Sequence, residues 1–555
     1  MWAPRARDVA LVLGEGDRRV PMAGPDEGGT FAAEVEVPAG ADYAFSLDGG
    51  PARPDPRSPW QPSGVHGPSR LVDHAAFRWT DRGWVPPPLA ESVVYELHVG
   101  TFSPEGTFDG AAARLDHLVE LGVGAVEVMP VAEFPGRRGW GYDGVDLWAP
   151  HSAYGGPEGF KRLVDACHGR GLAVVLDVVY NHLGPDGNYL REFGPYFTDR
   201  YATPWGEAVN FDGPDSDPVR AFVVDNACMW VRDYHVDGLR LDAVHAIVDT
   251  SAIHIVEEIA AAVHALADGV GRPAWVVAES DLNDPRVVRP AERGGYACDA
   301  QWSDDFHHAL HAVLTGERDG YYADFGSLAQ LAKALRQAWV YDGCHSGYRR
   351  RRHGRPPAGL AGTAFFGYLQ NHDQVGNRAA GERSSALMST GRLKIGAAVV
   401  LCAPFVPMLF QGEEWGASTP FQYFTDHRDA ELGRAVSEGR RREFAAFGWQ
   451  PEDVPDPQDP ATFERSRLDW DERRRPPHDE VLEWHRHLVA LRREVPALAT
   501  EGLGPVDVRY DEDARWLVLE RGPLSVVCNL ASHEQAIPVA EGSVTVPPDN
   551  VVILG

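Results

Sequence analysis

One stretch of the sequence, residues 238–245, alternates leucines with charged side chains, in the order Leu239, Arg240, Leu241 and Asp242. In a strand, residues two apart share a face, so the arginine and the aspartate point together to one side. Opposite charges on the inner face of a buried strand are costly unless they pair or react. Taken alone, the stretch fits a structural ion pair and a reactive carboxylate equally well.

Three further strand-like runs end in polar residues of the same kind, namely residues 177–182, residue 279 and residues 371–373. Parallel strands in a barrel bring their carboxyl ends to one face. Three carboxylates from three strands, Asp242, Glu279 and Asp373, would then meet in one cleft. A single carboxylate at a strand end is more often a cap or turn residue, but this repetition favours a reactive site.

A retaining glycosidase requires such a set of groups. One carboxylate attacks the sugar and forms a glycosyl–enzyme bond, while a protonated second carboxyl group, about 5–5.5 Å away, donates to the leaving oxygen. An adjacent arginine keeps the nucleophile ionised, and crowding by other carboxylates raises the pKa of the acid. We expect His182 and His372 to donate hydrogen bonds to sugar hydroxyls.

The elements that must position these groups alternate from residue 89 onwards. Predicted strands cover residues 93–98, 123–129, 172–179, 238–242, 275–279, 364–369 and 406–410. Predicted helices cover residues 109–121, 159–169, 219–235, 251–267 and 480–493. About eight such units within roughly 400 residues predict an α/β fold built on a (β/α)8 TIM barrel.

The 555 residues are too many for one core, and the pattern changes on both sides of the barrel. Residues 1–88 predict an N-terminal β-sandwich, with short strands at 9–13, 31–37 and 43–47. Residues 89–495 form the catalytic barrel, with a long excursion at about 183–218. Residues 496–555 form a C-terminal β-sheet domain, with strands at 516–520 and 524–528.

The composition argues against several classes of partner. A net charge of −29 argues against nucleic acid, and the run Arg349–Arg352 is expected to be a solvated loop. The six scattered cysteines form no C-x-x-C motif and favour neither a zinc site nor a disulfide framework. The sequence has no secretion signal and no 18-residue apolar stretch, so we expect a cytoplasmic protein without a membrane partner.

Three histidines on one predicted helix, His307, His308 and His311, have a spacing that a metal could use. A pair at i and i+4, such as His307 and His311, shares one helix face, but no third ligand follows at a known spacing. We therefore expect a solvated or substrate-near helix, with no metal and no cofactor. The neighbouring acids Asp304 and Asp305 could line the cleft beyond the cut, although helix capping explains an aspartate there equally well.

The four strand ends resemble the signature regions of the α-amylase superfamily, glycoside hydrolase family 13, in the same order. The resemblance implies that Asp242 is the nucleophile, that Glu279 is the acid/base, and that Asp373 is the third carboxylate, which binds sugar hydroxyls. The residues that it implies in substrate binding are Tyr142, Asp143, His182, Arg240, His245, His372, Asp304 and Asp305.

Longer runs are similar to the malto-oligosyltrehalose trehalohydrolase family, at residues 65–69, 184–189, 210–213, 278–284, 302–308 and 421–427. That family cuts the α-1,4 bond next to the trehalose cap of a malto-oligosyl chain. The resemblance therefore implies malto-oligosyltrehalose as substrate, trehalose as product, and a functional pairing with the malto-oligosyltrehalose synthase that makes the substrate.

Two alternatives remain open from the sequence. The run at residues 95–102 is shared with 1,4-α-glucan branching enzymes, which favours a branching activity. Residues 1–88 resemble the carbohydrate-binding module of those enzymes, which would also fit a glucan-binding protein without turnover. Residues 1–4 match the middle of a longer family motif, so we expect the chain to begin inside the first strand of that module.

Overall fold

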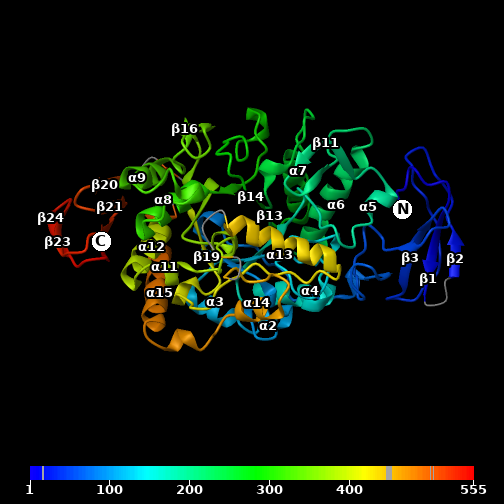
Figure 1. Cartoon of the computed structure of the whole chain (residues 1–555), viewed down its shortest axis with the longest axis horizontal. Coiled ribbons are helices and arrows are strands. Elements are labelled where there is room, and N and C mark those ends of the chain that lie inside the picture. The colour runs from blue at the N-terminus through cyan, green and yellow to red at the C-terminus, as the bar shows by residue number, and fades with distance from the viewer. Residues whose placement is uncertain (15–17, 446–449, 451–452, 500–501, 504–505) are drawn as a thin grey trace.

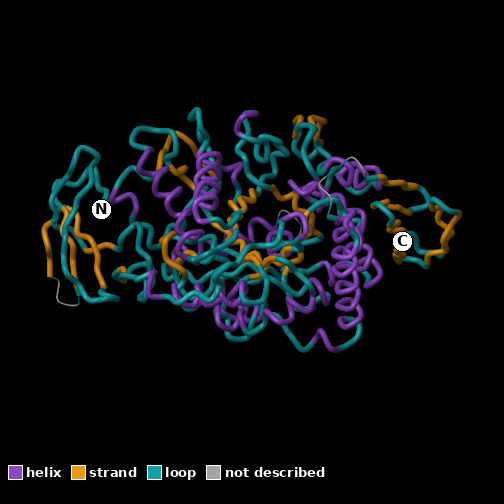
Figure 2. Tube along the Cα trace, turned by 180° about the vertical axis from the view of Figure 1, so that it is seen from behind, coloured by secondary structure: helices purple, strands orange, loops and turns teal. Residues whose placement is uncertain are grey.

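The computed structural model describes residues 1–14, 18–445, 450, 453–499, 502–503 and 506–555. A barrel with its surrounding helices occupies the middle of an elongated molecule (Figure 1). Small β-sheets lie at its two ends, the N-terminal sheet at one and the C-terminal sheets at the other (Figure 2). No helix within the described ranges combines the length and the apolar character that a transmembrane segment requires.

The centre is a closed barrel of eight parallel strands, as the sequence predicts. In barrel order they are β6 (Val94–Leu97), β7 (Ala125–Val128), β10 (Ala173–Val178), β13 (Gly238–Leu241), β14 (Trp275–Ala278), β15 (Ala300–Trp302), β18 (Phe365–Tyr368) and β19 (Val406–Phe410). The last strand pairs with the first, which leaves no exposed strand edge.

The two faces of the barrel strands explain the alternation in the sequence. Leu239 and Leu241 of β13 point outward into the large core beneath the helices. Side chains such as Val175, Val277 and Phe366 fill the interior in a separate apolar cluster. The interior is therefore packed, and chemistry is confined to the ends of the strands.

The helices that cover the barrel are α2 (Phe108–Ala112), α3 (Leu115–Leu121), α4 (Gly156–His168), α6 (Asp217–Asp233), α7 (Ile255–Val270), α8 (Asp304–Thr315), α9 (Leu328–Gln337), α12 (Thr390–Cys402) and α15 (His478–Glu494). The helix predicted at 109–121 is in fact two, broken at residues 113–114. Between β14 and β15 the described chain forms only the short 3-10 turn η5 (Ala291–Arg293). The sequence missed β15 because three residues are too short for a periodic pattern.

Two segments rise above the carboxyl ends of the strands. The predicted excursion contains α5 (Leu190–Phe193) and a hairpin of β11 (Phe197–Thr203) and β12 (Gly206–Val209), with Trp205 in its turn. Farther along the chain, α13 (Ala430–Ala445) runs across the front of the barrel and α14 (Pro460–Arg465) follows it (Figure 1).

The N-terminal region holds a five-stranded antiparallel sheet of β1 (Val9–Leu13), β2 (Arg18–Pro21), β3 (Asp42–Leu47), β4 (Ala52–Arg53) and β5 (Ser69–Arg70). The predicted strand at 31–37 is wrong. Around this run the structure has only two isolated bridges, Trp2–Thr30 and Ala23–Ala32. Residues 33–37 alternate like a strand, but no strand in the described part of the chain supplies their backbone partners.

The C-terminal region holds a four-stranded sheet and a hairpin, formed by β20 (Asp507–Asp511), β21 (Trp516–Arg521), β22 (Leu524–Asn529), β25 (Asn550–Leu554), and the pair β23 (Gln535–Val539) and β24 (Gly542–Val546). The predicted strands at 516–520 and 524–528 are confirmed. All six cysteines of the chain are free thiols, and Cys344, in strand β16 (Asp342–Ser346), is exposed.

Candidate active site

A cavity of about 550 Å³ opens at the carboxyl ends of the barrel strands. Eight of the eleven residues predicted for the site line it: Tyr142, Asp143, His182, Asp242, His245, Glu279, His372 and Asp373. The three predicted carboxylates therefore meet at one cavity although they follow three different strands. Trp205 from the excursion, Tyr423 from the loop before α13, and Arg440 from α13 contribute to the other walls.

Arg240 is the cation around which the carboxylates gather, and it is fully buried beneath the cavity. Its Nη1 donates to Asp177 Oδ2 at 2.6 Å and to Asp242 Oδ1 at 2.9 Å. Its Nη2 donates to Glu279 Oε2 at 2.7 Å. Since both Asp242 and Glu279 contact one guanidinium, they lie close together, as a shared sugar ring requires.

The Arg240 guanidinium also packs against an aromatic ring. Its central carbon lies 4.3 Å from the centre of the Trp302 ring, in a cation–π contact. Trp302 belongs to β15, the strand that the sequence did not reveal. The buried ring thus covers the face of the guanidinium, while the three carboxylates bind its N–H groups.

His372 is tied to the opposite side of the cavity. Its backbone N–H donates to Glu96 Oε2 at 3.0 Å, and its Nδ1 also contacts the Glu96 carboxylate. The Tyr142 hydroxyl lies 2.7 Å from His372 Nε2 and donates to Asp177 Oδ2 at 2.7 Å. Burial lowers the pKa of His372, but Asp373 and Glu96 outweigh it and raise the pKa to about 9.

His182 contributes to the cavity in a different way. Its Nε2 lies 3.0 Å from the backbone oxygen of Tyr142. Its ring stacks on Trp205 with 4.4 Å between centroids and 5° between planes. Burial lowers the pKa of His182 to about 4, so the ring is neutral at neutral pH. The excursion therefore delivers an exposed indole to the edge of the catalytic cavity.

The pKa shifts of the two central carboxyl groups differ from the expected pattern. Burial, together with the charges of Glu279, Asp177 and Asp373, raises the pKa of Asp242 well above its usual value. Burial alone would raise the pKa of Glu279, but Arg240, His245 and the N–H of Ala243 favour the ionised carboxylate. Together they lower the pKa of Glu279 below its usual value. The sequence argument expected the reverse, because it assigned Arg240 to Asp242 alone, whereas the guanidinium binds both carboxylates.

Three predicted site residues lie outside the cavity lining. Arg240 lies beneath it. Asp304, in the first turn of α8, accepts a hydrogen bond from Tyr368, and burial with the Glu279 charge raises its pKa to about 7. Asp305 Oδ2 accepts from the N–H groups of Val340 and Tyr341, each at 2.7 Å. Its geometry is that of a loop anchor, so a substrate contact for Asp305 rests on the resemblance alone.

The helix with the three histidines is expected from the sequence to be solvated or near the substrate. The first expectation is wrong, because His307, His308 and His311 are all buried, and the second stays a prediction. His307 Nδ1 lies 2.7 Å from the carbonyl oxygen of Leu369, and His311 Nε2 lies 2.7 Å from Glu317 Oε2. These nitrogens pair with groups of the protein. Within the described residues, no group of three or more His, Cys, Asp or Glu is arranged to hold a metal ion.

Sequence reasoning missed the acids beneath the cavity. Glu96 in β6 and Glu127 in β7 are direct neighbours in the barrel, and both are buried. Burial, together with the charges of Glu96 and Asp177, raises the pKa of Glu127 well above its usual value. The available signal was a single glutamate inside each of two apolar strands, where a charge is costly without a functional reason.

The chain resembles known proteins over its whole length. Residues 73–202 match the family of the alpha amylase catalytic domain. The malto-oligosyltrehalose trehalohydrolase of Arthrobacter ramosus is 52% identical over 548 residues, which cover 98% of this chain and 94% of that protein. The namesake protein of Rhizobium sp. (strain M-11) is 51% identical and covers 96% and 91%. The chain belongs to the malto-oligosyltrehalose trehalohydrolase family.

Two further comparisons place the trehalohydrolase family member among its relatives. A 1,4-alpha-glucan branching enzyme of Bacillus caldolyticus is 30% identical over 340 residues, which cover 55% of this chain and 50% of that protein. A putative alpha amylase structure from Salmonella typhimurium superposes with a TM-score of 0.91 at 38% identity, covering 100% and 96% of the two chains. The similarity to the branching enzyme is thus partial, whereas the trehalohydrolase similarity is full-length.

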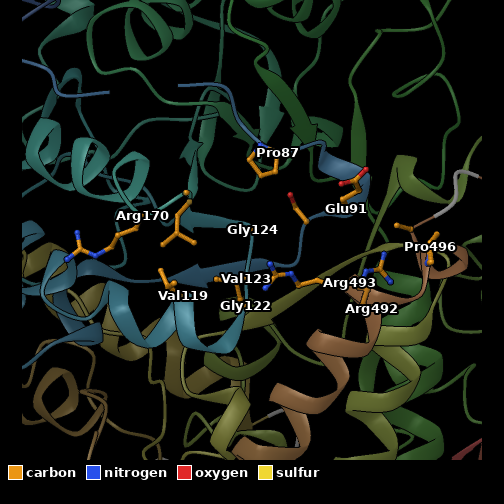
Figure 3. A pocket seen from close by; sticks show the side chains of 14 residues that line it. Pro87, Glu91, Val119, Gly122, Val123, Gly124, Arg170, Arg492, Arg493 and Pro496 are labelled. Carbon is orange, nitrogen blue, oxygen red and sulfur yellow. The ribbon is translucent and has the colours of Figure 1, made fainter. Parts of the chain in front are cut away.

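A second cavity of this trehalohydrolase family member, about 620 Å³, lies at the opposite end of the barrel, near the amino ends of β6, β7 and β10. Figure 3 shows Pro87 and Glu91 on one side of it and Arg492 and Arg493 on the other. Arg492 donates to the carbonyl oxygen of Leu401 in the last turn of α12, where a cation balances the helix dipole, and to that of Phe405 beyond the helix. This cavity contains none of the predicted catalytic carboxylates.

The His372–Glu96 contact in this trehalohydrolase family member leads to a prediction on pH. A pKa of about 9 for His372 means that its charge persists below pH 9 and is lost above it. The stability that the charge contributes is complete below the unfolded-state pKa of about 6.5 and disappears as the pH rises through about 9. Replacing Glu96→Gln should lower the His372 pKa and move the alkaline limb of kcat/KM to lower pH.

The pH dependence of kcat/KM tests this directly, with Glu158→Gln on the exposed face of α4 as control. The control should leave both limbs unchanged. An alkaline limb that stays in place in Glu96→Gln would show that the charge of His372 does not govern it.

Proposed function

We propose that this enzyme is a retaining glycosidase that cleaves the α-1,4 bond next to the terminal α,α-trehalose unit of malto-oligosyltrehalose and releases trehalose. One observation carries the reaction type: Asp242 and Glu279, from different strands, contact the same guanidinium and line one cavity with Asp373. The trehalohydrolases that match it over nearly its full length support the substrate.

In this proposal Asp242 and Glu279 act on opposite sides of the bond that is cut, Asp242 as the nucleophile and Glu279 as the proton donor. Asp242 attacks the anomeric carbon of the sugar that carries the malto-oligosyl chain, and a covalent glycosyl–enzyme forms. Glu279 gives its proton to the departing trehalose oxygen and then takes a proton from the water that hydrolyses the intermediate. Asp373 accepts hydrogen bonds from ring hydroxyls. Tyr142 provides a ring face for the same sugar.

The proposed mechanism needs a low pKa for Asp242 and a high pKa for Glu279, the reverse of the shifts in the structure. Arg240 can bring about this change when substrate binds. We infer that a sugar between the two carboxyl groups separates Glu279 from Arg240. Burial then raises the pKa of Glu279, as an acid requires, and the whole cationic charge acts on Asp242 and keeps it ionised. When Arg240 binds Asp242 alone and no longer Glu279, Asp242 becomes the nucleophile and Glu279 the acid.

Other parts of the assignment rest on the resemblance. We propose His245, Asp143, Asp304 and Asp305 as sugar-binding residues, and a functional pairing with a malto-oligosyltrehalose synthase that supplies the capped substrate. We also propose three domains, at residues 1–88, 89–495 and 496–555. The barrel strands all fall within the second of these, the five-stranded antiparallel sheet within the first, and the sheets formed by β20–β25 within the third.

Product analysis on capped and uncapped substrates tests the proposed function. Incubation with malto-oligosyltrehalose should release trehalose and a maltodextrin shortened by the cap, and uncapped maltodextrin of equal length should react far more slowly. New α-1,6 linkages on amylose, with no trehalose from the capped chain, would establish a branching enzyme instead. No turnover of either substrate would leave only glucan binding.

A further inference from the structure

Helix α13 forms one wall of the catalytic cavity although it lies about 60 residues beyond the third carboxylate in sequence. Three of its side chains, Val436, Arg440 and Glu443, line the cavity. None of them belongs to a strand end, and the sequence pattern gave them no role. The way in which Arg440 is held indicates what this wall does.

Asp373 is the second residue of a short helix, α10 (His372–Gly376), and the residue after the helix, Asn377, binds back to it. The side-chain amide of Asn377 donates to Asp373 Oδ1 at 3.1 Å. The backbone N–H of Asn377 also donates to the backbone oxygen of Asp373 at 2.9 Å. Asn377 and His372, whose Nε2 lies 3.5 Å from Asp373 Oδ1, thus contact the same oxygen of the carboxylate.

Arg440 grips the turn that carries this asparagine. Its Nη1 donates to Asn377 Oδ1 at 3.4 Å, and its Nη2 donates to the carbonyl oxygen of Gly376. With its oxygen bound by a guanidinium, the Asn377 amide is oriented so that its N–H₂ group faces Asp373. Two adjacent residues of the turn are thus fixed by one side chain from a distant helix.

Arg440 is itself held rigidly. Its central guanidinium carbon lies 5.2 Å from the centre of the Tyr423 ring and 4.7 Å from that of Phe444. Its side chain is 11% exposed, and its acidic neighbour, Glu443, is half-exposed at 3.4 Å. A surface pair at that distance contributes little, so the principal contacts of Arg440 are the two rings and the 376–377 turn.

The backbone of the turn cannot move away from these contacts. A Cβ atom at Gly376 would lie 2.0 Å from the Trp140 ring, which means that backbone and indole are in direct contact. Trp140 is fixed in turn by a 2.9 Å hydrogen bond from its Nε1 to the carbonyl oxygen of Gln422. The turn lies between the indole and the guanidinium, and Asp373 takes its orientation from it.

We propose that Arg440 is a positioning residue for the reaction: it orients Asn377, and Asn377 holds the Asp373 carboxylate toward the sugar hydroxyls. The inference rests on the proposed function, in which Asp373 binds the sugar that reacts. It assigns α13 a part in catalysis through a chain of contacts, without any contact between Arg440 and the reacting atoms. Misplacing one group of an active site by about 1 Å can cost about 100-fold in rate.

Kinetics of four variants test the proposal. Arg440→Ala and Asn377→Ala should each lower kcat about 10- to 100-fold and change KM less than about threefold, because the bound sugar keeps its other contacts. Arg440→Lys, which retains the cation but has a single donor nitrogen in place of two, should recover part of the loss. The control is Arg442→Ala on the exposed face of the same helix, which should change neither constant.

The double variant and the pH profile separate positioning from a general structural role. If the two residues act in one chain, the loss in Arg440→Ala/Asn377→Ala should equal the larger single loss. Asn377→Asp places a second negative charge beside Asp373, so it should raise that carboxyl pKa and move the acid limb of kcat to higher pH. Losses that add, or an unmoved acid limb, would overturn the proposal.

The result remains distinct from a failure of the proposed function. All variants are compared on the substrate that the unaltered enzyme turns over, whichever glucan that proves to be. Release of trehalose by the parent enzyme with undiminished kcat in Arg440→Ala would sink the positioning role alone. Thermal unfolding of each variant confirms that the comparison concerns folded protein.

Discussion

Replacing Asp242→Asn is expected to lower kcat by about 10⁴-fold or more while the protein stays folded. The amide keeps the shape of the side chain and can still accept a hydrogen bond from Arg240 Nη1, which lies 2.9 Å from Asp242 Oδ1. It cannot form the covalent bond to the sugar, and removal of a nucleophile costs nearly the whole rate enhancement of its catalytic unit. Trehalose release at saturating substrate measures the loss.

A smaller side chain identifies which carboxylate attacks. In Asp242→Ala, added azide can occupy the vacated volume and attack the anomeric carbon, so it should restore turnover and yield a glycosyl azide. Azide should give no such product in Asn377→Ala, in which the nucleophile is intact. The azide from Asp242→Ala should be the β-anomer, because azide attacks from the side of the missing nucleophile in a single displacement. Full activity of Asp242→Asn, or a β-glycosyl azide formed by Glu279→Ala and not by Asp242→Ala, would reverse the assigned roles.

Replacing Arg240→Met is expected to destabilise the protein by about 3–5 kcal/mol at neutral pH, in addition to removing activity. The guanidinium is the direct partner of three buried carboxylates, Asp177, Asp242 and Glu279, at 2.6–2.9 Å. Methionine fills the volume but leaves these acids without their cation. Chemical denaturation, followed at the transition of the barrel, measures the free energy of unfolding.

The pH dependence of this penalty follows from the shifts. The pKa of Glu279 is held down in the folded protein, so its contribution is present above its unfolded pKa and is lost as the pH falls through the folded pKa. The difference between Arg240→Met and the parent should therefore shrink on acidification. The matched control, Arg162→Met, removes a half-exposed pair with Asp109 and should cost under about 1 kcal/mol. Equal penalties in the two variants would contradict the role of Arg240.

The sequence predicted the parts of the fold that repeat. Seven of the barrel strands have a periodic apolar pattern, and the position of each strand end follows from it. The eighth, β15, is three residues long and carries no such signal, yet it supplies Trp302 against Arg240. The run at 31–37 shows the converse, because alternation alone does not form a strand when no partner strand is present.

The site residues that could be predicted are the carboxylates and histidines that directly follow a barrel strand. The sharing of Arg240 between Asp242 and Glu279 was not, because side-chain distances across three strands are absent from a linear pattern. Asn377 and Arg440 could not be found for a related reason. They act through a turn and through a helix about 60 residues farther along the chain, and each is unremarkable in its own stretch of sequence.

The free cysteines offer an experimental handle. Cys167, Cys298, Cys402 and Cys528 are buried and Cys228 is partly buried, and burial raises the pKa values of all five, whereas Cys344 is exposed on β16. That strand pairs with β17 (Arg351–Gly354), and Arg349 in the intervening turn binds Asp281, two residues beyond Glu279. A dye or spin label attached selectively to this thiol would therefore report on the hairpin beside the catalytic centre, in the native chain and without engineered mutations.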